Sequence, residues 1–361
     1  MPDLIAKEKK VQAALADLAA DAAKLNRTVR IMEVGTGHTV AIQRAGIRAL
    51  LPENVRLISG PGCPICTTPT GYIDGAIALA KRQNVLIATY EDMLRVPGTE
   101  SSLAHARDDG ARVQAVSSAF EAHLLANHNP DQPVIFAAVG FEASAPTTAD
   151  VLTRARNADL RNLFVLSAHK LIVPAMEHVA ADNVNRIDAF LCPGNLSVMT
   201  GYRAYEPIVA RHRRPCVIAG FDPPQIIEAV ARIVAQLADN DARVENVYTA
   251  AVGPDGYARA WEMIERVFRV ESAEWRGFGT IPNSGLATND TYKRFDAAQA
   301  FGIDLQGTGE RPGCRCAYVI TGHIDPPECP LFGRACTPEH PVGTCMVSTG
   351  GACHAWYKYR G

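Results

Sequence analysis

Apolar residues in this 361-residue chain fall into short runs that alternate with stretches of helical periodicity. Near the N-terminus, Val11, Leu15, Leu18 and Ala22 recur at the spacing of one helix face, which predicts an amphipathic helix within residues 1–27. The later runs predict strands at 29–34, 55–58, 85–90, 113–116, 134–139, 163–166, 189–191 and 216–219. Helical patterns between them cover 40–51, 72–81, 147–155, 173–181 and 225–237.

Apolar strands that alternate with helices are typical of parallel sheets with helices on both faces. The sequence therefore predicts the α/β class, with two parallel-sheet domains around a cleft. We expect a first domain at 28–125, which holds the first four strands, a second at 126–268, and an irregular Cys-rich region at 269–361. Residues 275–282 are expected to form an ordered loop, and the Cys-rich region to be held by a metal site rather than by a large core.

Composition narrows the classes of function. Hydrophobic residues make up 47% of the chain and charged residues 20%, as in ordinary globular proteins. The net charge of −2 provides no electrostatic footprint for nucleic acid or an anionic membrane. No apolar run approaches the roughly 20 residues of a membrane span, and the N-terminus is too polar for a secretory signal. We therefore expect a cytoplasmic protein that binds neither nucleic acid nor membrane.

Several polar and thiol side chains follow the ends of predicted strands. Parallel α/β sheets bind ligands at the carboxyl ends of their strands, so these side chains are candidates for a functional site. The candidates are Glu33, His38, Cys63, Cys66, Glu142, His169 and Lys170. An ordinary structural role fits His38, His169 and Lys170 equally well, and Glu142 also fits a helix cap.

Cys63 and Cys66 form a Cys-Pro-Ile-Cys sequence with the spacing of a redox dithiol. Such a spacing permits a disulfide, and a helix beginning just beyond it lowers the pKa of the thiol. The alternatives are half of a structural zinc site or two unreactive buried thiols. The flanking glycines and the position after a strand favour the reactive dithiol.

Six of the ten cysteines lie in the last 48 residues, a density that indicates metal binding or electron transfer in a reducing compartment. They are Cys314, Cys316, Cys329, Cys336, Cys345 and Cys353. Structural zinc sites usually pair their ligands in close knuckles. Here the gaps are twelve residues between Cys316 and Cys329, six between Cys329 and Cys336, and sixteen between Cys336 and Cys353. The spacing favours a [4Fe–4S] cluster, with zinc as the alternative.

Taken together, the motifs resemble those of the hydrogenase expression/formation protein family HypD, nearly from end to end. The matching stretches are Gly60-Pro61-Gly62-Cys63-Pro64-Ile65-Cys66, Gly140-Phe141-Glu142, Ser167-Ala168-His169-Lys170, Trp275-Arg276-Gly277, Cys329-Pro330-Leu331-Phe332-Gly333 and Ala355-Trp356-Tyr357-Lys358-Tyr359.

The resemblance implies a redox-active assembly factor rather than a conventional turnover enzyme. Members work with the small chaperone HypC and the cyanide donor HypE to assemble the Fe(CN)2CO group of [NiFe]-hydrogenase. The group would be held transiently in the cleft, while a [4Fe–4S] cluster and the dithiol supply electrons. By position, the cluster ligands would be Cys316, Cys329, Cys336 and Cys353, and Cys314 and Cys345 stay open as substitutes.

Three positions depart from the family pattern. Gly35 stands where the family has a cysteine thought to bind iron, Asn195 replaces a histidine and Gly350 replaces a glutamate. A thiolate, an imidazole and a carboxylate are thus missing from loops expected near the iron. The alternative hypothesis is therefore a divergent paralogue, a redox or scaffold protein that does not bind the Fe(CN)2CO iron.

Overall fold

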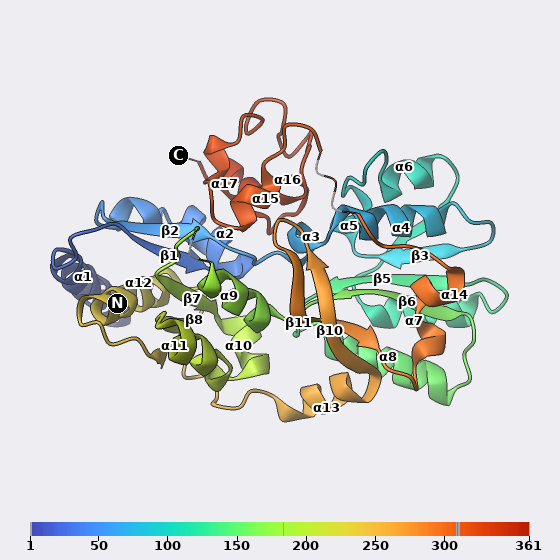
Figure 1. Ribbon diagram of the computed structural model, residues 1–361, viewed down its shortest axis with the longest axis horizontal. Helices are drawn as coiled ribbons and strands as arrows, with labels where there is room; N and C mark the ends of the chain where they lie inside the picture. The colour runs from blue at the N-terminus through green and yellow to red at the C-terminus, as the bar shows by residue number, and fades with distance from the viewer. Residues whose placement is uncertain (1, 183, 308, 310, 361) are drawn as a thin grey trace.

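Two parallel sheets, a long hairpin and a Cys-rich C-terminal segment make up the computed structural model (Figure 1), which describes residues 2–182, 184–307, 309 and 311–360. The hairpin stands between the two sheets, and the C-terminal segment lies over the junction next to α2 and α3. The predicted α/β class with parallel sheets and a Cys-rich C-terminal region is confirmed. Within the described residues, no helix has the length and apolar character needed to cross a bilayer.

Sheet A has five parallel strands in the order β2-β1-β7-β8-β9. β1 pairs with β2 in a register that sets Ile31 beside Leu57, and with β7 in one that sets Ile31 beside Ala189. The strands are β1 (Val29–Glu33), β2 (Val55–Ser59), β7 (Ala189–Pro193), β8 (Cys216–Ala219) and β9 (Val244–Asn246). The chain therefore leaves this sheet after β2 and returns to it more than a hundred residues later.

Sheet B has four parallel strands in the order β4-β3-β5-β6. They are β3 (Leu86–Thr89), β4 (Arg112–Ala115), β5 (Val134–Gly140) and β6 (Leu163–His169). All eight predicted strands are present, but the division of strands between domains at residue 125 is wrong. Each sheet takes strands from both predicted domains, because hydrophobic periodicity identifies a strand without identifying its partner.

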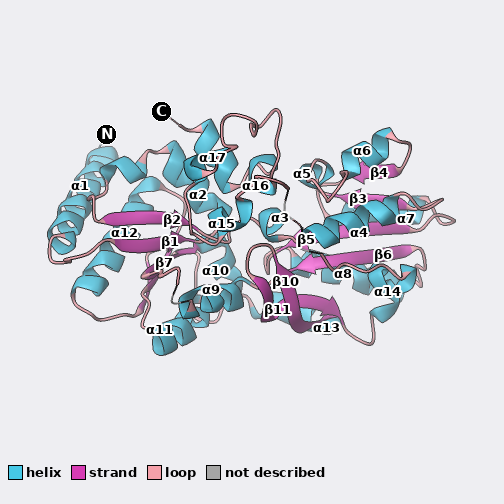
Figure 2. Cartoon of the chain, turned by 45° about the horizontal axis from the view of Figure 1, so that its top comes forward, coloured by secondary structure: helices cyan, strands magenta, loops and turns pink. Residues whose placement is uncertain are grey.

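The helices flank both sheets (Figure 2). They are α1 (Pro2–Ala22), α2 (Thr36–Arg44), α3 (Pro64–Thr67), α4 (Thr70–Ala80), α5 (Glu91–Leu94), α6 (Leu103–Asp108), α7 (Ala119–His128), α8 (Ala145–Asn157), α9 (Ile172–Ala181), α10 (Gly194–Thr200), α11 (Glu206–His212), α12 (Pro223–Ala238), α13 (Ala258–Val267), α14 (Ala297–Phe301), α15 (Cys316–Ile320), α16 (Thr344–Val347) and α17 (Ala352–Lys358). The helix predicted at 40–51 is instead α2 followed by a 3-10 turn at Ile47–Leu50, and Gly46 between them has φ 61°.

Successive strand residues point to opposite faces of each sheet and so belong to separate hydrophobic cores. In sheet A, Ile31 packs on the side of α1 and α12, whereas Met32 packs on the side of α9. In sheet B, Ile87 and Ala88 divide in the same way between two clusters. Both faces of both sheets are therefore buried, which explains why the strands read as continuous apolar runs.

The C-terminal segment shares the core that lies under one face of sheet B. Val319, Ile320, Met346 and Val347 are buried in the same cluster as Ile87. Full burial of one such side chain stabilises the fold by about 1.5–3 kcal/mol. Apolar packing in a large core thus anchors this segment, whereas the sequence predicted that something other than a large core would hold it.

Residues 268–288 form a hairpin and not the loop predicted at 275–282. Its strands are β10 (Phe268–Trp275) and β11 (Gly279–Thr288), joined through Gly277 at φ 79°. β11 contacts β6 on one side and α9 on the other, so the hairpin joins the two sheets. The alternation of exposed and buried residues in β10 is poor, which hid the strand from a periodicity analysis.

The loop after β2 passes close to the loop after β1. A Cβ added at Gly62 would lie 2.4 Å from the backbone nitrogen of Gly35, and the carbonyl oxygen of Gly62 accepts a hydrogen bond from Thr36 N. Only glycine at position 62 allows this approach.

We expect Gly62→Ala to lower the free energy of unfolding by about 1–3 kcal/mol, because two backbones must separate. Gly253→Ala is the matched control, since nothing lies within 4 Å of an added Cβ there. Urea unfolding with an unchanged m-value measures the loss. Equal stability of the two variants would contradict the close approach of these loops.

Candidate functional site

The dithiol sequence forms a single helical turn directly after β2. Cys63 precedes α3 as its N-cap, Pro64 occupies the first turn, and the N–H of Cys66 donates to Cys63 Sγ at 3.2 Å. Proline suits this position because the first helical N–H has no intrahelical partner. The turn therefore holds the two sulfurs on the same side of the backbone, as the spacing predicts.

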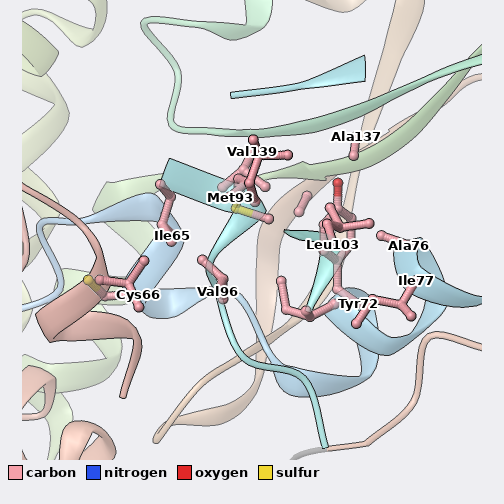
Figure 3. Close-up of a cluster of buried hydrophobic side chains, with 14 of the residues drawn as sticks. Ile65, Cys66, Tyr72, Ala76, Ile77, Met93, Val96, Leu103, Ala137 and Val139 are labelled. Carbon is pink, nitrogen blue, oxygen red and sulfur yellow. The ribbon is translucent and has the colours of Figure 1, made fainter. Parts of the chain in front are cut away.

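Both thiols of this turn are buried. Cys63 is 5% exposed and Cys66 is 0% exposed, and Cys66 belongs to the apolar cluster that contains Ile65, Met93 and Val96 (Figure 3). Chemistry at these sulfurs is therefore shielded from solvent, and a large reactant has no open route to Cys66.

The C-terminal segment supplies the other side of the dithiol environment. Cys63 Sγ lies 3.4 Å from Ser348 Oγ, and Cys66 Sγ lies 3.9 Å from the carbonyl oxygen of Thr344. The thiol of Cys66 also makes a hydrogen bond with the thiol of Cys345. Residues about 280 positions apart in sequence thus meet at the dithiol.

Cys345 connects this dithiol to further C-terminal cysteines. Its thiol makes hydrogen bonds with the thiols of Cys316 and Cys353 as well as with Cys66. Cys316 Sγ also accepts the backbone N–H of Cys345 at 3.2 Å and the hydroxyl of Thr344 at 3.8 Å. The five sulfurs of Cys63, Cys66, Cys345, Cys316 and Cys353 form one continuous chain of contacts, which we call the sulfur path.

The remaining C-terminal cysteines lie beside this path. Cys314 Sγ accepts the N–H of Cys316 at 3.4 Å, and Cys336 Sγ accepts the N–H of Val342 at 3.3 Å. A Cβ added at Gly343 would lie 2.4 Å from Cys314 Sγ and 2.8 Å from Cys316 Sγ, so the sulfurs crowd against bare backbone. Cys329 is buried but makes no hydrogen bond to another cysteine among the described residues.

The chemistry of these donors suits an iron–sulfur cluster, because thiolates that accept backbone N–H bonds are its usual ligands. Their arrangement fits less completely. In the described part of the chain, no group of three or more His, Cys, Asp or Glu side chains is arranged to hold a metal ion. Of the four predicted ligands, Cys316 and Cys353 are in contact, and Cys336 lies close enough to Cys316 to interact electrostatically.

Burial and hydrogen bonding divide the thiols into two kinds. Burial opposes ionisation of Cys63, but hydrogen bonds with Cys66 and Ser348 outweigh it and lower the pKa of Cys63. Burial and the bonds to Cys345 and Cys63 raise the pKa of Cys66 well above its usual value. Bonds from Cys316, Cys353 and Cys66 bring the pKa of Cys345 well below the ordinary thiol value. Thiolate character is thus favoured at Cys63 and Cys345, at opposite sides of Cys66.

Glu33 and His38 have structural partners and no hydrogen bond to the thiols. Glu33 is buried, and its Oε1 forms an ion pair with Arg48 at 2.8 Å. The same oxygen accepts a hydrogen bond from the hydroxyl of Ser59 at 2.8 Å. The ring nitrogens of His38 face the carbonyl oxygens of Val34, Ala219 and Gly220. Burial lowers the pKa of His38 to about 4, so its imidazole is neutral at pH 7.

The loop between Glu33 and His38 is closed by packing at Gly35. This residue has φ 99°, and an added Cβ would lie 2.7 Å from Cβ of Pro193. An added Cβ at Gly350 would lie 2.9 Å from Cβ of Thr36. Two of the three positions that depart from the family pattern therefore have neighbours in the space that a larger side chain needs.

Glu142, His169 and Lys170 lie at the carboxyl ends of β5 and β6, as predicted, but none hydrogen-bonds to a cysteine within the described chain. Glu142 Oε1 accepts the N–H of Ile172 at 2.6 Å and caps α9, and burial raises the pKa of Glu142 to about 7. His169 contacts Thr148 at 2.9 Å, and burial lowers its pKa to about 4.

Sequence reasoning missed the residues that link the dithiol to the C-terminal segment. Thr344 and Ser348 contact the thiols, and Cys345 joins two cysteine groups. No local sequence signal marks these contacts, because they join residues about 280 positions apart in the chain.

Comparison with known proteins agrees with the motif pattern. The sequence model described as "HypD: Hydrogenase formation hypA family" matches residues 9–360. The hydrogenase maturation factor HypD of Azotobacter vinelandii is 43% identical over 340 residues, which cover 92% of this chain and 90% of that protein. HypD of Escherichia coli K12 is 42% identical over 335 residues, with 92% and 90% coverage. HypD of Cupriavidus necator is 39% identical over 345 residues, with 93% and 91% coverage.

The buried histidines predict that the fold weakens in mild acid. His38 and His169 have pKa values of about 4 in the folded chain against 6.5 when exposed, so the unfolded chain binds more protons between these values. Between pH 7 and 5 each should cost about 2 kcal/mol of unfolding free energy. Glu142 acts in the opposite direction, because its pKa of about 7 exceeds the ordinary 4.5 and the folded chain takes up its proton first.

Urea unfolding of the parent chain and of Glu142→Gln at pH 7 and pH 5 measures these contributions. We expect the variant to lose more stability on acidification, because it lacks the opposing carboxyl. A smaller loss in the variant would contradict the assignment.

Proposed function

Because the chain belongs to the HypD family of hydrogenase maturation factors, we propose that it supports assembly of the Fe(CN)2CO group of [NiFe]-hydrogenase. Its proposed partners are a HypC-type small chaperone and a HypE-type cyanide donor. In this proposal the iron group is cargo that is built and passed on, and the chain itself supplies thiols and electrons.

The sulfur path is the observation that supports the electron-supplying role. Cys66 contacts Cys63 on one side and Cys345 on the other, and Cys345 contacts Cys316 and Cys353. Oxidation of Cys63 and Cys66 to a disulfide releases two electrons and two protons, and forms one S–S bond at the loss of two S–H bonds. A purely structural pair of buried thiols does not require contact with a third thiol, which here is that of Cys345.

We propose that Cys316, Cys329, Cys336 and Cys353 hold a [4Fe–4S] cluster, which supplies one-electron chemistry when bound. The backbone N–H groups of Cys345 and Val342 already donate to Cys316 and Cys336. Cys329 is assigned by its place in the motif Cys329-Pro330-Leu331-Phe332-Gly333. Cys345 is then the link between ligands and dithiol and is not itself a ligand.

A second candidate function is a redox or scaffold protein that no longer holds the iron group. It is favoured by the packing at Gly35, where Pro193 lies in the space that a side chain would need. With glycine at position 35, any iron bound nearby would need ligands from other residues of this chain or from a partner.

Iron analysis of variants tests the cluster assignment. Cys316→Ser and Cys336→Ser should lose iron and acid-labile sulfide after anaerobic purification, and also stability. Cys63→Ser, Cys66→Ser and Cys345→Ser are the controls and should keep both. Loss of iron from Cys345→Ser alone would make Cys345 a ligand, and zinc in a colourless parent protein would refute the cluster.

An infrared spectrum tests the assembly role. The chain, co-expressed with HypC-type and HypE-type partners and purified without oxygen, should show bands of metal-bound cyanide and carbon monoxide. A family member with cysteine at the position of Gly35 is the positive control. Bands in the control and none in this chain would overturn the assembly role and leave the scaffold function.

A further inference from the structure

Lys170 is a buried amine with very few partners. The residue is 3% exposed, and its Nζ donates one hydrogen bond, to the carbonyl oxygen of Glu274 at 2.8 Å. The same nitrogen lies 5.4 Å from the ring centroid of Trp275. Among the described residues, no carboxylate oxygen lies within the 4 Å of an ion pair. An ammonium group in this position leaves hydrogen-bonding capacity unused, which is costly away from water.

A cavity of about 320 Å³ lies against this residue. Its walls come from the end of β6, from the hairpin β10–β11 and from the start of α4. The lining residues include Pro69, Tyr72, Ser167, Lys170, Glu274 and Leu305. The cavity is large enough for a small organic molecule, and it lies at the carboxyl end of a parallel strand, where such sheets bind ligands.

The cavity is separate from the sulfur path. None of its lining residues is a cysteine, and in the described chain Lys170 has no hydrogen bond to one. The hairpin forms one wall of it: the backbone of Lys170 bridges to Gly285, and Ser167 Oγ donates to the carbonyl oxygen of Leu286 at 2.8 Å. A ligand in this cavity would therefore contact both sheet B and the hairpin.

Burial favours a neutral amine over an ammonium at Lys170. Burial lowers the pKa of Lys170 to about 7, and Glu274 opposes this only in part. His169 is neutral and faces Thr148, and the hydroxyl of Tyr72 donates to the carbonyl oxygen of Leu166. At neutral pH much of the amine therefore carries a free electron pair, as in lysines that act as nucleophiles.

The wall of the cavity also limits the ligand. Glu271 and Glu274 both line it, and their carboxylates repel an anion. A carboxylate or phosphate ligand is thus disfavoured, and an uncharged molecule is favoured.

We propose that Lys170 is the nucleophile of a second site, which binds a small uncharged aldehyde or ketone and holds it as an imine. Nζ adds to the carbonyl carbon, the π electron pair moves to the oxygen, and one of the two Nζ hydrogens passes to that oxygen as a proton, which gives a carbinolamine. The second Nζ hydrogen then leaves as a proton, the C–N double bond forms, and the hydroxyl takes up a proton and leaves as water. The step is a condensation and needs no oxidant or reductant.

Reductive labelling of the intact chain tests this site. The probe is propionaldehyde with cyanoborohydride at pH 7, and peptide mass spectrometry reads the labelling rate of each lysine. We expect Lys170 to react at least about tenfold faster than the exposed Lys81 and Lys293, because an ordinary lysine at pH 7 is almost wholly protonated. Its rate should level off above pH 7–8, whereas the rates of the exposed lysines should keep rising to pH 10.

Two controls separate a binding site from a merely reactive residue. Glyoxylate, an anionic aldehyde, should lose the preference for Lys170, because the cavity carboxylates repel it. Lys170→Met, which is uncharged and of similar length, should unfold in a single cooperative transition like the parent and show no fast-labelling lysine. Labelling of Lys170 only after unfolding, or at the rate of Lys81, would overturn the proposal, as would equal preference for the two aldehydes.

Discussion

The packing of the C-terminal segment onto the turn that carries Cys63 and Cys66 is the interaction on which the functional part of this fold depends. It buries Met346 and Val347 in the core beneath sheet B and brings Cys345 against Cys66. This apolar contact brings together two groups of cysteines that lie about 280 residues apart in the sequence. Apolar packing and sulfur chemistry therefore depend on the same few residues.

Burial sets the character of each group in the molecule. Cys66 and Cys345 are both fully buried, yet they differ in the preferred state of the thiol because Cys345 accepts bonds from its neighbours. His38 and His169 are neutral for the same reason that Glu142 retains its proton near pH 7, namely the loss of water around them. The polar residues that the motifs single out thus have mostly structural partners here, and the redox role that we propose rests on the thiols.

Local sequence patterns predicted the local structure well. The eight strands and the dithiol turn could be located from apolar runs and residue spacing, because those signals lie within a few residues. The pairing of β1 with β7 could not, since partner choice depends on where the chain returns after residue 169. The hairpin was not predicted for another reason: Arg269, Val270 and Glu271 are all exposed, so β10 shows no alternation of buried and exposed residues.

The candidate site divides in the same way, between local features that the sequence predicted and tertiary contacts that it did not. The spacing of Cys63 and Cys66 identified a dithiol, but the contacts of Thr344 and Ser348 with it arise from tertiary packing alone. The environment of Gly35, which packs against Pro193, likewise depends on the end of β7, 158 residues away in the chain.

The interleaving of the two sheets has a consequence for the order in which the protein is made. All four strands of sheet B have left the ribosome soon after residue 169, so this sheet is complete while synthesis continues. β1 and β2 emerge first, yet they must wait for β7, β8 and β9, the last of which ends at Asn246. During that interval they expose an unpaired apolar edge, the feature that chaperones protect in nascent chains.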